Sequence, residues 1–402
     1  MTHPIRTYVN AIAAQLIELR RELHQIPEPG LNLPLTAARI RQEIEALGLP
    51  FLQCRSATGF TAVLRGERPT NDARPLVLLR ADMDALPIVE NTSYPWASTN
   101  GNMHACGHDL HMAGLVGAMR ALTHVRDQLA GDVIFMFQSG EEGHDGAQYM
   151  INENMLEAAG RLPDHAYALH VWASRFPSGF IGTKPGPIMA SSDTLKITVR
   201  GRGGHGSAPH ENLDPIPVAA QIILDTQVMI AREFSIFDPV VATCGQIHAG
   251  TAPNITPDTA SLDYTLRAFN PDTRKRLVTR VSELARSTAR SHDMRAEVEH
   301  VELYPVTVNA DAEYSFVKSA VQQTFPGRWG LQAEPMAAAE DFSKILNQIP
   351  GCFISVSAVA PDVDHRQAPF NHSSKAEFAD TVVPDCASIL ALLAWERLTT
   401  DG

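Results

Sequence analysis

The chain has 402 residues, of which 44% are hydrophobic and 19% charged, a composition typical of a globular protein. Its formal net charge of −12 argues against a nucleic-acid-binding surface, which requires a basic patch. No apolar run reaches the ~18 residues of a membrane span, and the N-terminal residues lack the pattern of a signal peptide. Five scattered cysteines are typical of a protein in a reducing compartment. We therefore expect a cytoplasmic protein without a membrane partner.

The elements expected along the first half of the chain alternate between helices and apolar strands. Apolar residues recur at helical spacing around residues 12–23 and 37–47, which predicts two helices in this region. Four apolar runs bounded by turns then predict strands: TAVLRG, PLVLLR, DVIFMFQ and HAYALHVW. Fully apolar strands separated by helices indicate a mostly parallel sheet covered by helices on both faces, that is, an α/β domain.

A different order of elements follows the Lys-Pro-Gly-Pro segment at residues 184–187. The sequence there predicts strand, helix, strand, strand, helix and strand, ending near residue 304. This order is typical of a ferredoxin-like α+β unit. Because the run CFISVSAV is again a fully apolar strand like those of the first half, we expect residues 188–304 to be a domain inserted into a larger one made of residues 1–187 and 305–402.

Residues of the types that bind metal ions follow the predicted strands or lie in loops. In open α/β sheets, ligands bind beyond the carboxyl ends of the strands. Thiolate, imidazole and carboxylate are the usual ligands of zinc and manganese, and a pair of such ions can activate a water molecule and polarise a carbonyl. The five candidates are Cys106, His108, Glu142, His170 and His372.

The neighbouring residues Glu141 and Glu142 suggest a division of labour. Successive side chains on an extended backbone point in different directions, so one carboxylate can bind metal while the other accepts a proton from water. Taken singly, a histidine or cysteine is more often a packed residue than a ligand, and Asp82 and Asp84 could simply cap a turn. We interpret His104 and His111, which lie in the same segment, as structural.

Together, the motifs resemble those of the metallo-aminoacylase and carboxypeptidase family, in the branch of hippurate hydrolase and the indole-acetyl-amino-acid hydrolases. The similarity runs almost end to end. Its most specific segments are RRELHQIPEPG (20–30), RADMDALPIVE (80–90), MHACGHDLHMAG (103–114), FQSGEEGHDGAQ (137–148), GRGGHGSAPH (201–210) and FNHS (370–373).

The resemblance implies a role for each candidate residue. The five candidates named above would hold two divalent ions, and Cys106 would be a ligand of both. The ions would be manganese or zinc, with nickel and cobalt as further options. Glu141 would be the general base, and Asp82 would orient a metal-binding imidazole. His205 would reach the active site of a neighbouring subunit. The α-carboxylate of the substrate would be held by Asn254 and Arg267.

The resemblance also implies an activity: hydrolysis of the amide bond of a small N-acyl amino acid, such as hippurate, to a carboxylic acid and a free amino acid. The inserted domain would act as a lid and would join subunits into a homodimer or homotetramer. The alternatives are a dipeptidase or carboxypeptidase with the same metal site and, from another class, a non-catalytic metal-binding protein.

Overall fold

A computed structural model describes residues 3–70 and 74–399 and divides the chain into two compact units. The larger unit comprises Met1–Gly186, Val308–Ala333 and Asp341–Gly402, and the smaller one Pro187–Thr307 and Glu334–Glu340. The sequence pattern predicted that residues 334–340 belong to the large domain. They belong to the smaller unit because Met336 donates its N–H to the carbonyl of Ile188 (2.8 Å) and accepts one from Ala190 (2.9 Å).

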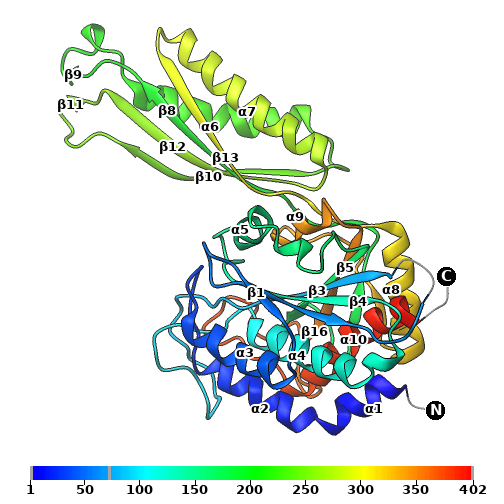
Figure 1. Cartoon of the computed structure of the whole chain (residues 1–402). Coiled ribbons are helices and arrows are strands. Elements are labelled where there is room, and N and C mark those ends of the chain that lie inside the picture. Colours follow the sequence, from blue (N-terminus) through cyan, green and yellow to red (C-terminus); the bar gives the residue numbers. More distant parts are fainter. Residues whose placement is uncertain (1–2, 71–73, 400–402) are drawn as a thin grey trace. The chain divides into compact units, whose positions relative to one another are not determined.

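The larger unit is built on one eight-stranded sheet with the strand order β1-β2-β4-β3-β5-β16-β6-β15 (Figure 1). Its central neighbours β4, β3, β5 and β16 run parallel, whereas β1 and β2 are antiparallel additions at one edge. The mostly parallel α/β sheet that the apolar runs predicted is confirmed. The strands are β1 (Phe51–Gln53), β2 (Phe60–Arg65), β3 (Leu76–Asp82), β4 (Asp132–Gln138), β5 (His165–Trp172), β6 (Ile181–Thr183), β15 (Trp329–Leu331) and β16 (Gly351–Ser357).

Helices surround this sheet, and the N-terminal region contains one more than the two that the sequence predicted. The extra helix, α1, has Pro4 at its start, where the missing N–H costs nothing, and the ring of His3 accepts the N–H of Ile5 (3.2 Å). The helices are α1 (Pro4–Ala11), α2 (Ala13–His24), α3 (Pro34–Ala46), α4 (His108–His124), α5 (Gly146–Asn152), α8 (Asp311–Thr324), α9 (Phe342–Leu346) and α10 (Val383–Thr399).

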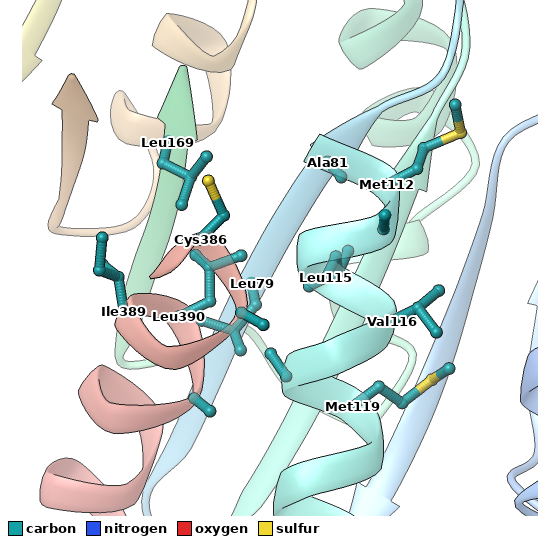
Figure 2. Close-up of a cluster of buried hydrophobic side chains, with 14 of the residues drawn as sticks. Leu79, Ala81, Met112, Leu115, Val116, Met119, Leu169, Cys386, Ile389 and Leu390 are labelled. Atoms are coloured by element: carbon teal, nitrogen blue, oxygen red, sulfur yellow. The ribbon is translucent and has the colours of Figure 1, made fainter. Parts of the chain in front are cut away.

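The main core lies where α4 and α10 pack side by side against the sheet. Figure 2 shows Leu115 of α4 and Leu390 of α10 beside Leu79 of β3, and all three are almost completely buried. Small residues let the helices approach closely, since a Cβ added to Gly117 would lie 2.6 Å from the Cβ of Ala387. This packing holds the first turn of α4, which begins at His108, at the carboxyl edge of the sheet.

The smaller unit is a four-stranded antiparallel sheet in the order β10-β12-β8-β13, with α6 and α7 as its helices. Its elements follow the predicted ferredoxin-like order: β8 (Ser192–Arg200), α6 (Pro215–Glu233), β10 (Val240–Ala249), β12 (Thr259–Ala268), α7 (Pro271–Ser291) and β13 (Arg295–Tyr304). A short pair, β9 (Gly204–His205) with β11 (Ile255–Thr256), forms one tip of this unit (Figure 1).

Two further short strands, β7 (Gly186–Met189) and β14 (Thr307–Asn309), lie where the chain passes from one unit to the other. Across residues 3–70 and 74–399, none of the helices combines the length and the apolar character that a membrane span requires.

We expect Leu115→Ala to destabilise the larger unit by ~2–5 kcal/mol, because the change removes buried methyl groups and leaves a cavity between α4 and α10. Leu35, which is 57% exposed, provides a matched control, and Leu35→Ala should change stability by less than ~0.5 kcal/mol. Urea denaturation followed by tryptophan fluorescence measures this unit alone, since all four tryptophans lie in it. Equal effects of the two substitutions would contradict the described core.

Candidate metal centre

Parallel strands deliver the candidate residues to one edge of the sheet. β3 ends at Asp82, β4 ends at Gln138 just before the two glutamates, and His170 lies close to the end of β5. Because these three neighbouring strands run parallel, their carboxyl ends meet at the same edge. Cys106 and His108 lie at the start of α4, and His372 follows β16 in a loop.

All five predicted ligand residues come together there. The Sγ of Cys106 lies 3.3 Å from Nε2 of His170. Oε1 of Glu142 lies 3.0 Å from Nε2 of His372 and 3.9 Å from Nε2 of His108. Potential ligand atoms lie within 4.8 Å of one another in several groups of residues, and two of these groups contain the cysteine: Cys106, His108 and His170, and Cys106, Glu142 and His372.

The hydrogen bonds of two histidines show which ring nitrogen is available to a metal ion. Nδ1 of His108 lies 2.8 Å from the carbonyl oxygen of Asp84, and Nδ1 of His170 lies 2.8 Å from that of Val171. A carbonyl only accepts, so Nδ1 donates in both rings, and Nε2 is the nitrogen that provides a lone pair when the ring is in the neutral form that binds a metal ion. Nε2 of His108 is buried and has no hydrogen-bond partner within the described part of the chain, which fits a metal ligand.

His111 lies against the same cluster, but both of its ring nitrogens are already used. Its Nε2 accepts the backbone N–H of Val171 (2.9 Å), which leaves the proton on Nδ1. Nδ1 then donates to Oδ1 of Asp82 (2.6 Å). His111 therefore has no lone pair for a metal ion, although its side chain lies within 4.8 Å of potential ligands.

The charges of the cluster favour a cation. Burial lowers the pKa of His108, but Asp82, Asp84 and Glu142 outweigh this effect and raise that pKa to about 10. Burial raises the pKa of the Cys106 thiol well above its usual value, and Glu142 and Glu141 raise it further. Negative charge is thus concentrated in a buried place, where a divalent cation stabilises both the carboxylates and an ionised thiol. The donor set fits such ions.

The segment that carries the two glutamates is held by Asp84, for which the sequence indicated no more than a turn cap. Oδ1 of Asp84 accepts the backbone N–H of Glu141 (3.0 Å), and Oδ2 accepts that of Glu142 (2.9 Å). Asp84 is itself buried. Gly140 and Gly143 flank the pair with φ angles of +75° and +78°, which turn the chain sharply around the glutamates. The Asp-x-Asp pattern at residues 82–84 was the available sequence signal.

Arg80 and Asp82 form a buried ion pair beside the cluster (2.6 Å). Arg80 also reaches Oδ1 of Asp341 (3.0 Å) and Oε1 of Gln138 (3.0 Å). Asp82 lies 3.7 Å from Nε2 of His108, whereas the hydrogen bond that orients the His108 ring comes from the carbonyl of Asp84. Asp82 therefore contacts the cluster mainly through His111 and Arg80.

Asn371 is a second residue that sequence reasoning missed, although it lies in the FNHS motif. Its side-chain amide donates to the carbonyl of Val171 (3.1 Å) and lies 3.8 Å from Sγ of Cys106. Its Oδ1 accepts the N–H of Ala173 (2.9 Å). The next residue, His372, has a φ of +69°, an unfavourable conformation that the surrounding loop maintains so that the ring reaches Glu142.

The other three predicted site residues lie in the smaller unit. His205 and Asn254 come together at its tip, where Gly206 donates to the carbonyl of Asn254 (2.9 Å) and His205 pairs with Ile255. Arg267 lies near the far end of β12. Arg267 lies eight residue steps along β12 from Thr259, which adjoins that tip, so the two places are about 26 Å apart at ~3.3 Å per residue.

Comparison with known proteins shows what the chain resembles. A thermostable carboxypeptidase 2 of Saccharolobus solfataricus is 33% identical over 360 residues, 88% of this chain and 88% of that protein. An IAA-amino acid hydrolase ILR1-like 2 of Arabidopsis thaliana is 32% identical over 388 residues, 95% of this chain and 85% of that protein. Among solved structures, the Bacillus subtilis YXEP protein, described as a dinuclear metal-binding peptidase, has a TM-score of 0.83 at 29% identity and covers 98% of this chain and 100% of its own.

The similarity also extends to a whole family. The model of peptidase family M20/M25/M40 matches residues 78–396, which include all five candidate ligands. The chain belongs to peptidase family M20/M25/M40 and is a metal-dependent hydrolase of amide or peptide bonds.

Proposed function

We propose that this chain is an amidohydrolase with two metal ions that cleaves the amide bond of N-acyl amino acids and releases a carboxylic acid and a free amino acid. The observation that carries the proposal is the convergence of Cys106, His108, Glu142, His170 and His372 with Glu141 directly beside them. The thiol belongs to two groups of potential ligand atoms, which supports Cys106 as the ligand shared by two ions.

Divalent ions bound to these residues would polarise the amide carbonyl and make water a better nucleophile at neutral pH. A mixed set of thiolate, imidazole and carboxylate suits zinc or manganese, and also nickel or cobalt. The chain's own residues select the orientation of the imidazoles, because the carbonyls of Asp84 and Val171 accept from Nδ1 and leave Nε2 as the nitrogen that can bind a metal ion.

Glu141 is the proposed general base. It is 7% exposed, and its backbone N–H is fixed by Asp84, so the carboxylate is presented from a rigid turn. In the proposed reaction, Glu141 accepts a proton from the attacking water and transfers it to the amide nitrogen as the C–N bond breaks. Glu142, its neighbour, is engaged with His372 and cannot serve both purposes.

Arg267 supports a substrate that carries a carboxylate. Its guanidinium is half-buried, and its pKa is lowered by that burial, although Asp193 acts in the opposite direction. No hydrogen bond or ion pair to the Arg267 side chain is found among residues 3–70 and 74–399. A partly desolvated guanidinium of this kind gains most from a planar anion such as the α-carboxylate of an acyl amino acid.

The long distance between Arg267 and the tip of the smaller unit supports an active site made of residues from more than one copy of the chain. His205 and Asn254 lie about 26 Å along the sheet from Arg267, which exceeds the length of a small N-acyl amino acid. One copy therefore cannot apply all three residues to the same substrate molecule. We assign His205 and Asn254 to a site whose other residues belong to a second copy, where His205 would stabilise the oxyanion.

The surface of the smaller unit supports such assembly into a homodimer or homotetramer. On α6, Ile216, Leu224 and Val228 are 41%, 67% and 61% exposed, and the last two lie on the side of the helix opposite its buried residues. β10 forms an edge of the four-stranded sheet, and its Ile247 is 49% exposed. An exposed apolar stripe beside an unpaired strand edge is typical of a protein interface.

A carboxypeptidase or dipeptidase with the same metal site is the main alternative, because one relative is named a carboxypeptidase and another an amino acid hydrolase. Product analysis separates the two. N-benzoyl and N-acetyl amino acids are compared with free dipeptides, each with the metal-depleted protein reloaded with manganese, zinc, nickel or cobalt. The proposal requires faster turnover of the acyl amino acids in at least one metal form.

We expect Glu141→Gln to keep both metal ions and to lose about 10²–10⁴-fold in kcat, because the change preserves size and removes the base. Metal content by mass spectrometry and turnover of an N-acyl amino acid measure the two effects separately. Near-normal turnover in a metal-loaded variant would rule out the assigned role.

Arg267→Lys should lower kcat/KM for an N-acyl amino acid by about 10- to 100-fold, since a bidentate contact to a charged group is replaced by a single one. The same acyl compound with its carboxylate converted to an amide serves as the control substrate, and its kcat/KM should not change further. An equal loss on both substrates would show that Arg267 does not bind the carboxylate.

A mixture of two inactive variants, His205→Ala and Glu141→Gln, should recover activity if His205 acts on a second copy. Random exchange between dimers would restore about a quarter of the wild-type activity, since half of the dimers contain one complete site. Co-purification of differently tagged variants establishes the exchange independently. No recovery despite demonstrated exchange, or a fully active monomer, would contradict the proposal.

A further inference from the structure

The segment Arg20–Gly30 contributes no candidate ligand, yet it contains two basic side chains that are completely buried. Arg20 and His24 lie one turn apart on α2, and both are completely buried. Burying charged groups in this way is unfavourable unless each is paired. The partners of these two side chains show what the segment does.

His24 joins two carboxylates that lie far apart in the sequence. Its Nδ1 lies 2.8 Å from Oδ2 of Asp109, and its Nε2 lies 3.1 Å from Oε1 of Glu90. A carboxylate only accepts, so both ring nitrogens donate and the imidazole carries a positive charge. Burial alone would lower the pKa of His24, but Asp109 and Glu90 outweigh it and leave this pKa above its ordinary value.

Arg20 completes the cluster. Its Nε lies 2.7 Å from Oδ2 of Asp109, and its Nη1 lies 2.9 Å from Oδ1 of Asp380. The guanidinium also stacks over the ring of Trp96, with its carbon 4.2 Å from the ring centre. Two cations of α2 thus contact the same carboxylate oxygen, Oδ2 of Asp109.

Both carboxylates that His24 joins belong to the part of the chain that carries Cys106 and His108. Asp109 immediately follows His108 in the first turn of α4. Glu90 lies in the long connection between β3 and α4, which contains no helix and no strand of the sheets, only isolated bridges between Leu86 and Met103 and between Ala85 and Pro29. Without regular structure, this connection depends on side-chain contacts for its shape.

Other residues of the segment hold the same connection. The carbonyl of Pro27 accepts the side-chain amide of Asn100 (2.9 Å), and that of Glu28 accepts the N–H of Ala85 (2.9 Å). Glu90 additionally accepts the N–H of Ser98 (2.6 Å). The segment therefore contacts the connection at several points, and His24 ties Glu90, in the first half of the connection, to the first turn of α4.

We propose that His24 is a positioning residue for the metal site: by joining Glu90 to Asp109 it holds Cys106 and His108 in place to bind the two ions. This inference rests on the proposed metal site. The alternative is that the buried cluster stabilises the fold without affecting the site. The two hypotheses differ in metal affinity, which positioning changes and general stability does not.

Two substitutions separate the contacts of the ring. In His24→Asn the amide nitrogen can replace Nδ1 and keep the contact to Asp109, and in His24→Gln it can replace Nε2 and keep the contact to Glu90. His165→Asn is the matched control. Its Nδ1 pairs with Glu313 at 2.9 Å in the same unit, but at the start of β5, away from the candidate ligands.

The test is a zinc titration of the metal-depleted full chain in competition with a chromophoric chelator, together with thermal unfolding of each variant. We expect both His24 variants to bind zinc about 10- to 100-fold more weakly than wild type, the effect typical of groups that orient metal ligands. His165→Asn should keep wild-type zinc affinity, whatever its change in thermal stability. Hydrogen exchange of residues 84–107 should become faster in the His24 variants only.

Each outcome decides one question. Unchanged zinc affinity in both His24 variants, or a loss equal to that of His165→Asn, would overturn the positioning role and leave the proposed function intact. A wild-type chain that fails to bind two ions would refute the proposed function itself. Should the His24 variants not fold, Glu90→Gln removes the charge at constant size, and the same loss of affinity is expected from it.

Discussion

The structure of this site depends on one electrostatic constraint: several acidic groups and a thiol are buried together at the carboxyl edge of one sheet. Asp82, Asp84 and Cys106 are all almost inaccessible to solvent, and Glu142 lies beside them. Like charges repel strongly where water is excluded, so the arrangement is stable only with compensating positive charge. Arg80 compensates Asp82, and the remaining negative charge is what divalent ions would neutralise.

The same constraint explains the cations behind the site. Asp109 would add a further negative charge next to His108, but Arg20 and His24 hold it from α2, and its pKa is strongly lowered, in spite of burial, by these partners. Backbone conformation completes the arrangement. His372 occupies a positive-φ conformation that costs of order 1–3 kcal/mol, and its N–H donates to the carbonyl of Ala105 (2.9 Å), which holds the loop where the ring reaches Glu142.

Much of this could be predicted from the sequence, because the relevant signals are local. Apolar runs and the order of elements indicated both sheets, and residue types after strand ends indicated the five candidate ligands. The tertiary contacts could not be predicted. The hydrogen bonds of Asp84 and Asn371 and the exhausted ring nitrogens of His111 depend on chain segments far apart in the sequence. The distance between His205 and Arg267 depends on the pairing of β9 with β11 at the start of β12, a contact that the sequence pattern does not reveal.

The central claim is that five side chains bind two divalent ions with Cys106 between them. Anomalous diffraction from a crystal grown with manganese measures this directly, because it locates each ion independently of any assay. We predict two anomalous peaks per chain, both within coordination distance of Sγ of Cys106, one also beside His108 and His170 and the other beside Glu142 and His372. A single peak, or peaks that do not contact Cys106, would contradict this claim.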